Sequence, residues 1–151
     1  MVQSNPIYIC EARMEFEVKS PLLGFEEVSK MKLIIIDDVF MKLQAKNEEE
    51  HPIFTLVNPY ALREYKFDIP DVAIEALELT EDSNISILNI VVVQDPISAS
   101  TVNFAAPIIF NTDNNTMIQI ILDTSKNDFG IAEPISSFMT KNQEEEQETK
   151  E

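Results

Sequence analysis

The run from Ile85 to Val93, ISILNIVVV, constrains the fold more than any other stretch of the chain. In an extended strand its apolar residues fall on both faces, with Ile85, Ile87, Val91 and Val93 on one and Leu88, Ile90 and Val92 on the other. This pattern predicts a strand that is covered on both sides. A short buried helix would show the same run, but the five β-branched residues from Ile87 onward favour a strand. Asp95-Pro96 then ends it, because proline restricts its own φ and its predecessor.

Two more apolar segments follow this strand and complete an expected three-stranded antiparallel meander. Thr101 to Asn111 is the second strand, and Pro107 within it predicts an edge strand or a bulge, because proline cannot donate to a ladder. Met117 to Leu122 is the third strand. The polar segment Thr112 to Asn115 joins them as a turn, since asparagine tolerates a positive φ better than most residues.

The remainder of the chain is also mostly strand by pattern. Period-two alternation or short apolar runs predict strands within residues 7–18, 31–36, 40–45, 53–57 and 65–69. Only Asp71 to Leu79, DVAIEALEL, has helical periodicity, and Pro70 before it suits the start of a helix. Its expected apolar stripe is Val72, Ala73, Ala76 and Leu77. We therefore predict a mostly β, antiparallel fold with one main short helix.

Composition indicates one domain with an acidic extension. The chain has 151 residues, 44% of them hydrophobic, which is enough for one buried core. The full charge is −16, and residues 142–151 contribute −4 of it through five acids and one lysine, so residues 1–141 carry −12. We expect a β domain over 1–141 and a disordered acidic tail over 142–151. The acidity either favours a basic partner and repels nucleic acid, or serves solubility alone.

Nothing in the sequence predicts an anchor, a disulfide or a secretory signal. No apolar run approaches the ~18 residues of a membrane span. The N-terminus lacks a basic segment followed by an apolar one, so no signal peptide is expected. The single cysteine, Cys10, cannot form an internal disulfide. The lone cysteine fits a reducing compartment.

The catalytic inventory is poor. His51 is the only histidine, and one histidine with one cysteine cannot form a typical His/Cys zinc site. With two glycines the chain has no phosphate-binding loop. Carboxylates are plentiful, so an acid/base pair stays open, but none stands in a recognisable motif. These residues favour a binding protein over an enzyme, and they indicate no metal or cofactor.

Two features are candidates for partner binding. The first is the acidic helix face of Asp71, Glu75 and Glu78, extended by Glu81 and Asp82, for which a plain solvated face is the alternative. The second is the loop Asn58-Pro59-Tyr60 after an expected strand, for which an ordinary turn is the alternative.

Several stretches, in this order, resemble the flagellar assembly factor FliW family, and together they cover roughly Ile7 to Pro134. They are LLGFEE at 22–27, KLIIIDD at 32–38, FTLVNPY at 54–60, FDIPDVAIEALEL at 67–79, ISILNIVVV at 85–93, STVNFAAPIIFN at 100–111 and IQIILD at 118–123. No single piece is decisive, but their order and spacing are. The acidic tail lies outside the family pattern.

The resemblance implies a compact, mostly antiparallel β barrel-like domain and a regulatory function. FliW proteins are cytoplasmic regulators and not enzymes. They bind CsrA, a small basic dimeric repressor of translation, and antagonise it without occupying its RNA site. They also bind newly made flagellin, so that flagellin secretion frees them to sequester CsrA. The alternatives are an acidic β-domain chaperone for another secreted subunit and, third, an enzyme with paired carboxylates of raised pKa.

Overall fold

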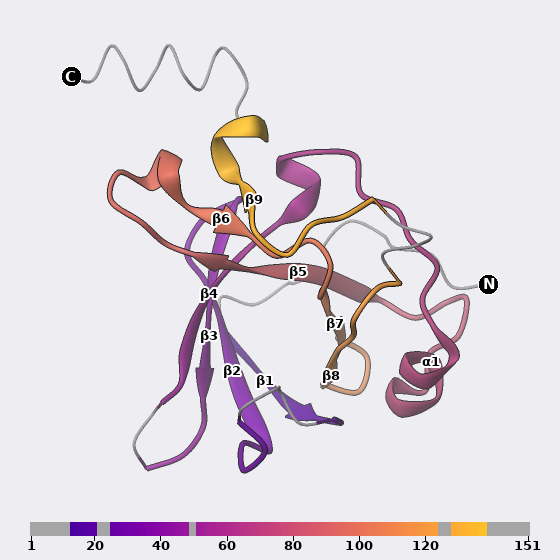
Figure 1. The fold of residues 1–151 in the computed structure, drawn as a ribbon. Helices are drawn as coiled ribbons and strands as arrows, with labels where there is room; N and C mark the ends of the chain where they lie inside the picture. Colours follow the sequence, from indigo (N-terminus) through magenta and orange to yellow (C-terminus); the bar gives the residue numbers. More distant parts are fainter. Residues whose placement is uncertain (1–12, 21–24, 49–50, 124–127, 139–151) are drawn as a thin grey trace.

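The computed structural model describes residues 13–20, 25–48, 51–123 and 128–138. Within them the chain forms one nine-stranded sheet, one α-helix and three short 3₁₀-helices (Figure 1). The strands are β1 (Arg13–Val18), β2 (Lys30–Ile35), β3 (Phe40–Ala45), β4 (Ile53–Val57), β5 (Ile85–Val92), β6 (Thr101–Val102), β7 (Ile108–Asn111), β8 (Thr116–Gln119) and β9 (Glu133–Pro134). The helices are η1 (Pro59–Ala61), α1 (Asp71–Leu77), η2 (Ile97–Ala99) and η3 (Ile135–Phe138). The expected strand residues before Arg13, and the acidic tail, lie outside the described residues.

Seven of the strands close into a barrel. Their order is β4-β3-β2-β1-β8-β7-β5, and β4 pairs with β5 to complete the ring. Every pair in the ring is antiparallel except β1 with β8, where Glu17 lies opposite Thr116 and Val18 opposite Met117. Strands β6 and β9 extend the sheet from the far end of β5. The predicted mostly β, barrel-like fold is confirmed, with one parallel pair that the sequence did not indicate.

The predicted meander is confirmed as β5, β7 and β8, in which Ile87, Ile109 and Ile118 lie side by side. The turn at 112–115 is also confirmed, and Asn115 there has a φ of 56°. The predicted second strand is instead split into β6 and β7. The edge alternative was wrong, because β7 lies between β5 and β8. The bulged alternative agrees with the register, since the six steps from Val102 to Ile108 lie opposite only three steps from Leu88 to Val91, and β7 begins directly after Pro107. Pro107 therefore lies just outside the ladder, and no ladder hydrogen bond requires the N–H that proline lacks.

The barrel wall separates two apolar cores, and β5 contributes to both. The inner core contains residues from all seven barrel strands, including Phe16, Met31, Leu33, Leu43, Leu56, Leu88, Phe110 and Met117. The outer core lies on the opposite face of β5, β7 and β8 and includes Ile85, Ile87, Val91, Ile109 and Ile118. Helix α1, the segment 65–69 and Ile135 cover this outer core. The two-sided burial predicted for residues 85–93 is thus confirmed up to Val91, while Val92 and Val93 are exposed.

Helix α1 is shorter than predicted. It ends at Leu77, and Glu78 adopts the left-handed conformation with a φ of 54°. The N–H of Leu79 returns to the carbonyl of Ile74, which closes the last turn. The helix buries Ala73 and Leu77, but Val72, expected in the apolar stripe, is 62% exposed. At roughly 100° per residue, Val72 falls on the solvent side of a stripe that is centred on Ala73 and Leu77.

Candidate functional site

The loop Asn58-Pro59-Tyr60 forms a fixed turn at one end of the barrel. The side-chain oxygen of Asn58 accepts a hydrogen bond of 3.1 Å from the N–H of Tyr60 and thereby caps η1. The N–H of Asn58 donates to the carbonyl of Val39 at 2.7 Å, which ties the loop to the β2–β3 turn. Pro59 is buried and Tyr60 is half-buried. The side chains of Asn58 and Pro59 therefore serve the fold.

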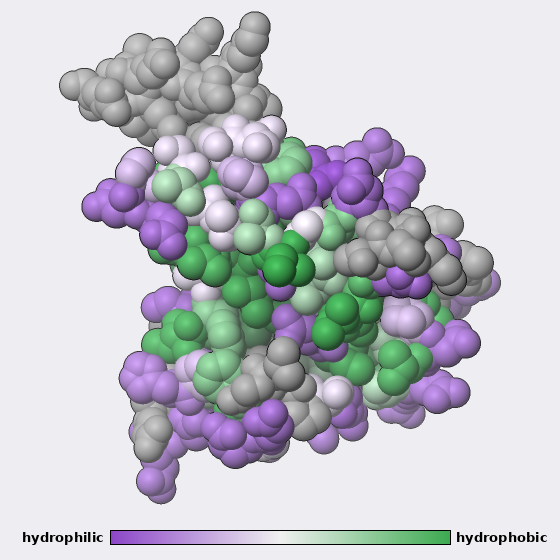
Figure 2. Space-filling model, in the orientation of Figure 1, coloured by the Kyte–Doolittle hydropathy of each residue, from purple (hydrophilic) through white to green (hydrophobic). Residues whose placement is uncertain are grey.

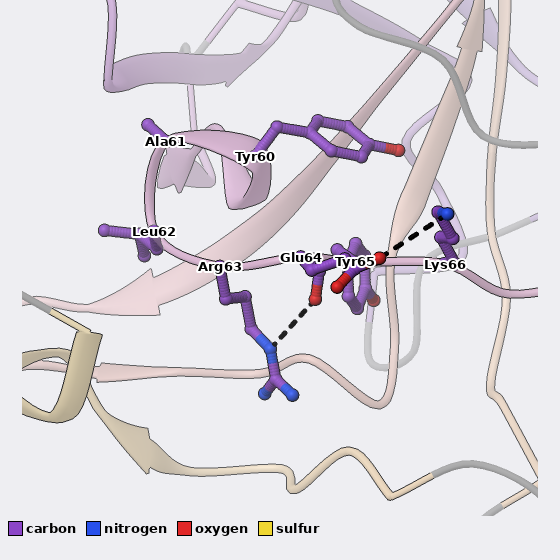
Figure 3. A pocket seen from close by; sticks show the side chains of 7 residues that line it. All are labelled: Tyr60, Ala61, Leu62, Arg63, Glu64, Tyr65 and Lys66. Atoms are coloured by element: carbon purple, nitrogen blue, oxygen red, sulfur yellow. Dashed lines mark hydrogen bonds and ion pairs between the residues drawn. The ribbon is translucent and has the colours of Figure 1, made fainter.

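A shallow, open hollow of about 530 Å³ lies beside this loop and is lined by residues 60–66 (Figure 3). A second hollow of about 510 Å³ shares Arg63, Glu64 and Lys66 and adds Phe129 and Phe138 from the C-terminal segment. Exposed Lys66 pairs with Glu64 at 3.4 Å. The two hollows thus adjoin, and both mix apolar walls with charges of either sign.

Arg63 joins the loop to the C-terminal segment. Its guanidinium carbon lies 5.0–5.1 Å from the ring centroids of Phe104, Phe129 and Phe138, a cation–π arrangement with three rings. One guanidinium nitrogen is 3.3 Å from Glu133, whose other carboxylate oxygen accepts the N–H of Gly130 at 2.7 Å. The sequence analysis missed this cluster because its members are far apart in the chain and share no motif.

Tyr65 anchors the same region from inside. Its hydroxyl donates to the carbonyl of Phe104 at 2.5 Å and accepts from the amide of Asn89 at 3.1 Å. The Asn89 amide also donates to the carbonyl of Asn103 at 2.9 Å. Burial raises the pKa of the Tyr65 hydroxyl well above its ordinary value, so it remains a neutral donor. This network holds the break between β6 and β7 against the barrel.

The predicted acidic residues form a second, continuous surface. Asp71 and Glu75 are exposed on α1, Glu78 is exposed at its C-terminal end, and Glu81 and Asp82 are exposed in the turn that follows. The carbonyl of Leu77 accepts hydrogen bonds from the side chains of Asn111 and Asn114, which fixes this end of the helix to the β7–β8 turn.

The same turn adds another acid beside this surface. Asp113 accepts from both the backbone and the side chain of Asn84, and these bonds lower the pKa of its carboxyl. Residues 67–123 contain nine acids and no lysine, arginine or histidine, so no basic side chain interrupts this part of the chain.

The structure does not bring the two predicted features together. In Figure 1, η1 lies at the top of the molecule beside β9, and α1 lies at the lower right beside β8. Figure 2 shows apolar atoms in the middle of this face, over β5 and β7, with hydrophilic atoms around the rim.

Two features are absent from the part of the chain that the structure describes. It has no group of three or more histidine, cysteine, aspartate or glutamate residues that could hold a metal ion. It also has no helix that is long and apolar enough to cross a membrane.

Comparison with known proteins gives one consistent result. The family model described as FliW protein matches residues 4–135. Flagellar assembly factor FliW 2 of Wolinella succinogenes is 54% identical over 126 residues, covering 83% of this chain and 92% of that protein. Flagellar assembly factor FliW of Sulfurimonas denitrificans is 50% identical over 128 residues, covering 85% of this chain and 100% of that protein.

The fold agrees with these matches. A crystal structure of the flagellar assembly factor FliW superposes with a TM-score of 0.74 at 25% identity, covering 84% of this chain and 87% of that one. The chain belongs to the FliW family of flagellar assembly factors, which are not enzymes.

Proposed function

We propose that this protein binds the translational repressor CsrA and newly made flagellin in the cytoplasm, and so couples flagellin synthesis to flagellin secretion. Membership of the FliW family supports the pair of partners. When flagellin is abundant it occupies the protein. When flagellin is exported, the free protein sequesters CsrA and flagellin translation resumes.

The observation that carries the CsrA assignment is the acidic surface on α1 and the turn that follows it. Asp71, Glu75 and Glu78 are exposed there, and none of them forms an ion pair with a described basic residue. An acidic surface of this kind speeds the encounter with a basic protein. Once attached to CsrA it also repels incoming RNA, which gives antagonism without occupation of the RNA site.

The experiment is titration calorimetry and association kinetics with CsrA and with flagellin, at low and moderate salt. The first variant carries Asp71→Lys, Glu75→Lys and Glu78→Lys. We expect slower association with CsrA and a flatter salt dependence, because charges at an interface rim act mainly on the encounter. Each single reversal should change Kd by about fivefold or less, since an exposed pair contributes about 0.2–1 kcal/mol. Flagellin binding that depends on apolar burial should be largely unchanged.

A matched control separates position from net charge. Glu26→Lys, Glu27→Lys and Glu48→Lys change the net charge by the same amount, and all three side chains are exposed away from α1. This control should leave CsrA association closer to that of the unmodified protein. Equal effects of the two triple variants would mean that overall charge, and not the α1 surface, governs capture.

Tyr60→Ala tests the loop at 58–60 on its own. Unchanged CsrA affinity and salt slope in the α1 triple variant, with a loss in Tyr60→Ala, would move the CsrA site to the loop. Flagellin binding without any CsrA binding would instead favour the alternative function, an acidic β-domain chaperone for a secreted subunit.

A further inference from the structure

One side of the barrel's outer surface is covered by other segments of the chain, and the other side, which we call the bare wall, is not. The outer faces of β5, β7 and β8 lie under α1 and the chain segments that complete the outer core. The outward residues of β1, β2 and β3 alternate with buried ones and remain exposed or partly exposed. Adjacent outward positions pair in register as Glu15 with Lys32, Glu17 with Lys30, and Ile34 with Lys42. The bare wall is therefore a polar sheet face.

This face gathers lysines on a strongly acidic protein. We call it the lysine face, and its lysines are Lys19, Lys30, Lys32, Lys42 and Lys46. It also carries two acids, Glu15 and Glu17, so its net charge is +3, whereas that of the whole chain is −16. Lys46 lies 2.6 Å from Glu15, and Lys19 lies 3.5 Å from Glu17. The hydrogen bond from Lys46, with the nearby charges of Lys30 and Lys32, lowers the pKa of Glu15. Three lysines thus surround one carboxylate, and Lys42 has no ion pair with a described residue.

We propose that the lysine face is a docking surface for the protein's own acidic residues 142–151. That segment, NQEEEQETKE, contains five glutamates and no apolar residue, so charge is its main means of attachment. The lysine face is the largest group of basic side chains among the described residues, because residues 67–123 contain no basic side chain, while Arg63 is paired with Glu133 and Lys66 with Glu64. The family match ends at residue 135, so this contact is an addition to the shared domain.

The register of the sheet shows that the acidic segment can reach this face. One row of paired residues runs Lys42, Thr55, Val91, Val102 and Glu133 around the wall. Four strand spacings of about 4.8 Å place Glu133 roughly 19 Å from Lys42 along the sheet. Phe138, the last residue of η3, follows Glu133 by five residues and so lies at most about 16 Å from it and within about 35 Å of Lys42. Glu148 and Glu151 follow Phe138 by ten and thirteen residues, which span up to about 33 and 43 Å at roughly 3.3 Å per residue. The end of the acidic segment can therefore reach Lys42 with η3 in place.

Zero-length carbodiimide cross-linking of the full chain, read by mass spectrometry, tests the contact. Tail glutamates, above all Glu148 and Glu151, should link to lysines of the lysine face. The link between Glu15 and Lys46, already 2.6 Å apart, serves as an internal standard. Ionic strength of about 1 M, where the Debye length is about 3 Å, should reduce the tail links severalfold relative to that standard.

Matched variants keep the test specific. Lys32→Gln with Lys42→Gln should reduce tail links at the remaining lysines, Lys19, Lys30 and Lys46, severalfold. Lys66→Gln, which removes an exposed lysine elsewhere, should leave them unchanged. Replacing the five tail glutamates with glutamine should shift backbone amide resonances of β1–β3 and leave those of β7 and β8 in place.

Three results would overturn the proposal. One is the absence of tail links to the lysine face. Another is a yield of links to Lys66 that matches the yield to the lysine face. The third is linking between chains in a mixture of isotopically labelled and unlabelled protein, which would assign the face to the tail of a second copy.

Discussion

Single buried polar groups position the loops of this protein. Tyr65 is the clearest example, because its ring contacts Phe67, Phe104 and Phe129 while its hydroxyl serves two partners. An aromatic ring with a polar end can join an apolar cluster to backbone groups that would otherwise be buried without a partner. The break between β6 and β7 is held in place in this way.

Tyr65→Phe should lower the free energy of unfolding by about 1–3 kcal/mol near neutral pH, because it leaves the Phe104 carbonyl and the Asn89 amide with fewer partners. The pKa of Tyr65 is raised by folding, so its stabilising contribution is complete below the unfolded value of about 10 and declines as pH rises above it. The deficit of the variant should therefore shrink above about pH 10. Urea unfolding of both proteins from pH 7 to pH 11 measures this, and a deficit independent of pH would contradict the assigned cause.

At the scale of residues, sequence patterns predicted exposure better than contact. The acids at 71–82 are exposed as expected, because alternation with apolar neighbours reports which side of an element faces water. The rings around Arg63 could not be predicted, since Phe104, Phe129 and Phe138 reach it only after the barrel has closed. By contrast, the capping of η1 by Asn58 agrees with the ordinary turn that the sequence offered as the alternative for this loop, because asparagine commonly accepts from the N–H two residues on.

The end of α1 is the clearest case at the scale of elements. The periodicity of residues 71–79 suggested that the helix continues to Leu79, but Glu78 leaves the helix in a left-handed conformation. Two asparagine side chains from the β7–β8 turn bind the carbonyl of Leu77 and favour termination there. Tertiary contacts therefore set a boundary that periodicity placed two residues later.

Glu78→Gly should raise the free energy of unfolding by up to about 1 kcal/mol, because glycine adopts a positive φ without the steric cost that other residues bear. Glu75→Gly removes the same charge from the helix interior and should lower it by about 1 kcal/mol. Thermal or urea unfolding of the pair measures both. A fall in stability of equal size in the two variants would contradict the assigned role of Glu78.

The strands were predicted with more success than their connections. Runs at 31–36, 40–45, 53–57 and 85–93 correspond closely to β2, β3, β4 and β5, because each shows apolar residues at strand spacing or on both faces. Residues 65–69 also alternate in burial but form no strand of their own. Alternation reports which side chains are buried, and it does not report whether a neighbouring backbone is available to pair.

At the scale of the whole molecule, charge predicts behaviour toward nucleic acid. We expect no shift of flagellin leader RNA by the isolated full chain in a gel assay, because the net charge of −16 opposes association with phosphates and the lysine face carries only +3. A shift should appear only when CsrA is present. Retardation of RNA by the protein alone, in low salt, would contradict this expectation.

The acidic tail should be dispensable for folding. Truncation after Lys141 should change Tm by less than about 2 °C, because the removed residues contain no apolar side chain and many exposed ion pairs contribute nothing measurable to stability. Differential scanning calorimetry at physiological salt measures this. A drop of several degrees would show that the tail packs as part of the folded domain.

Of all features of the fold, the closure of the barrel was the hardest to predict from sequence patterns. The family resemblance implied a barrel-like, mostly antiparallel domain, and the two-sided pattern of residues 85–93 indicated a strand between two layers. Neither indicated that β1 would meet β8 in parallel. Pairing between distant strands depends on the shape of the finished sheet, which local periodicity does not encode.

That parallel pair also sets an order of events during synthesis. In this pair of β1 with β8, Val18 lies opposite Met117, so the ring of strands remains open until β8 has left the ribosome. At about 5–20 residues per second, roughly 5–20 s separate the emergence of the two partners. During that interval β1–β4 can form only an open antiparallel sheet. The apolar inner face of this sheet lacks the cover that β5, β7 and β8 later supply. The nascent chain is therefore most exposed to aggregation in the seconds before its last barrel strand appears.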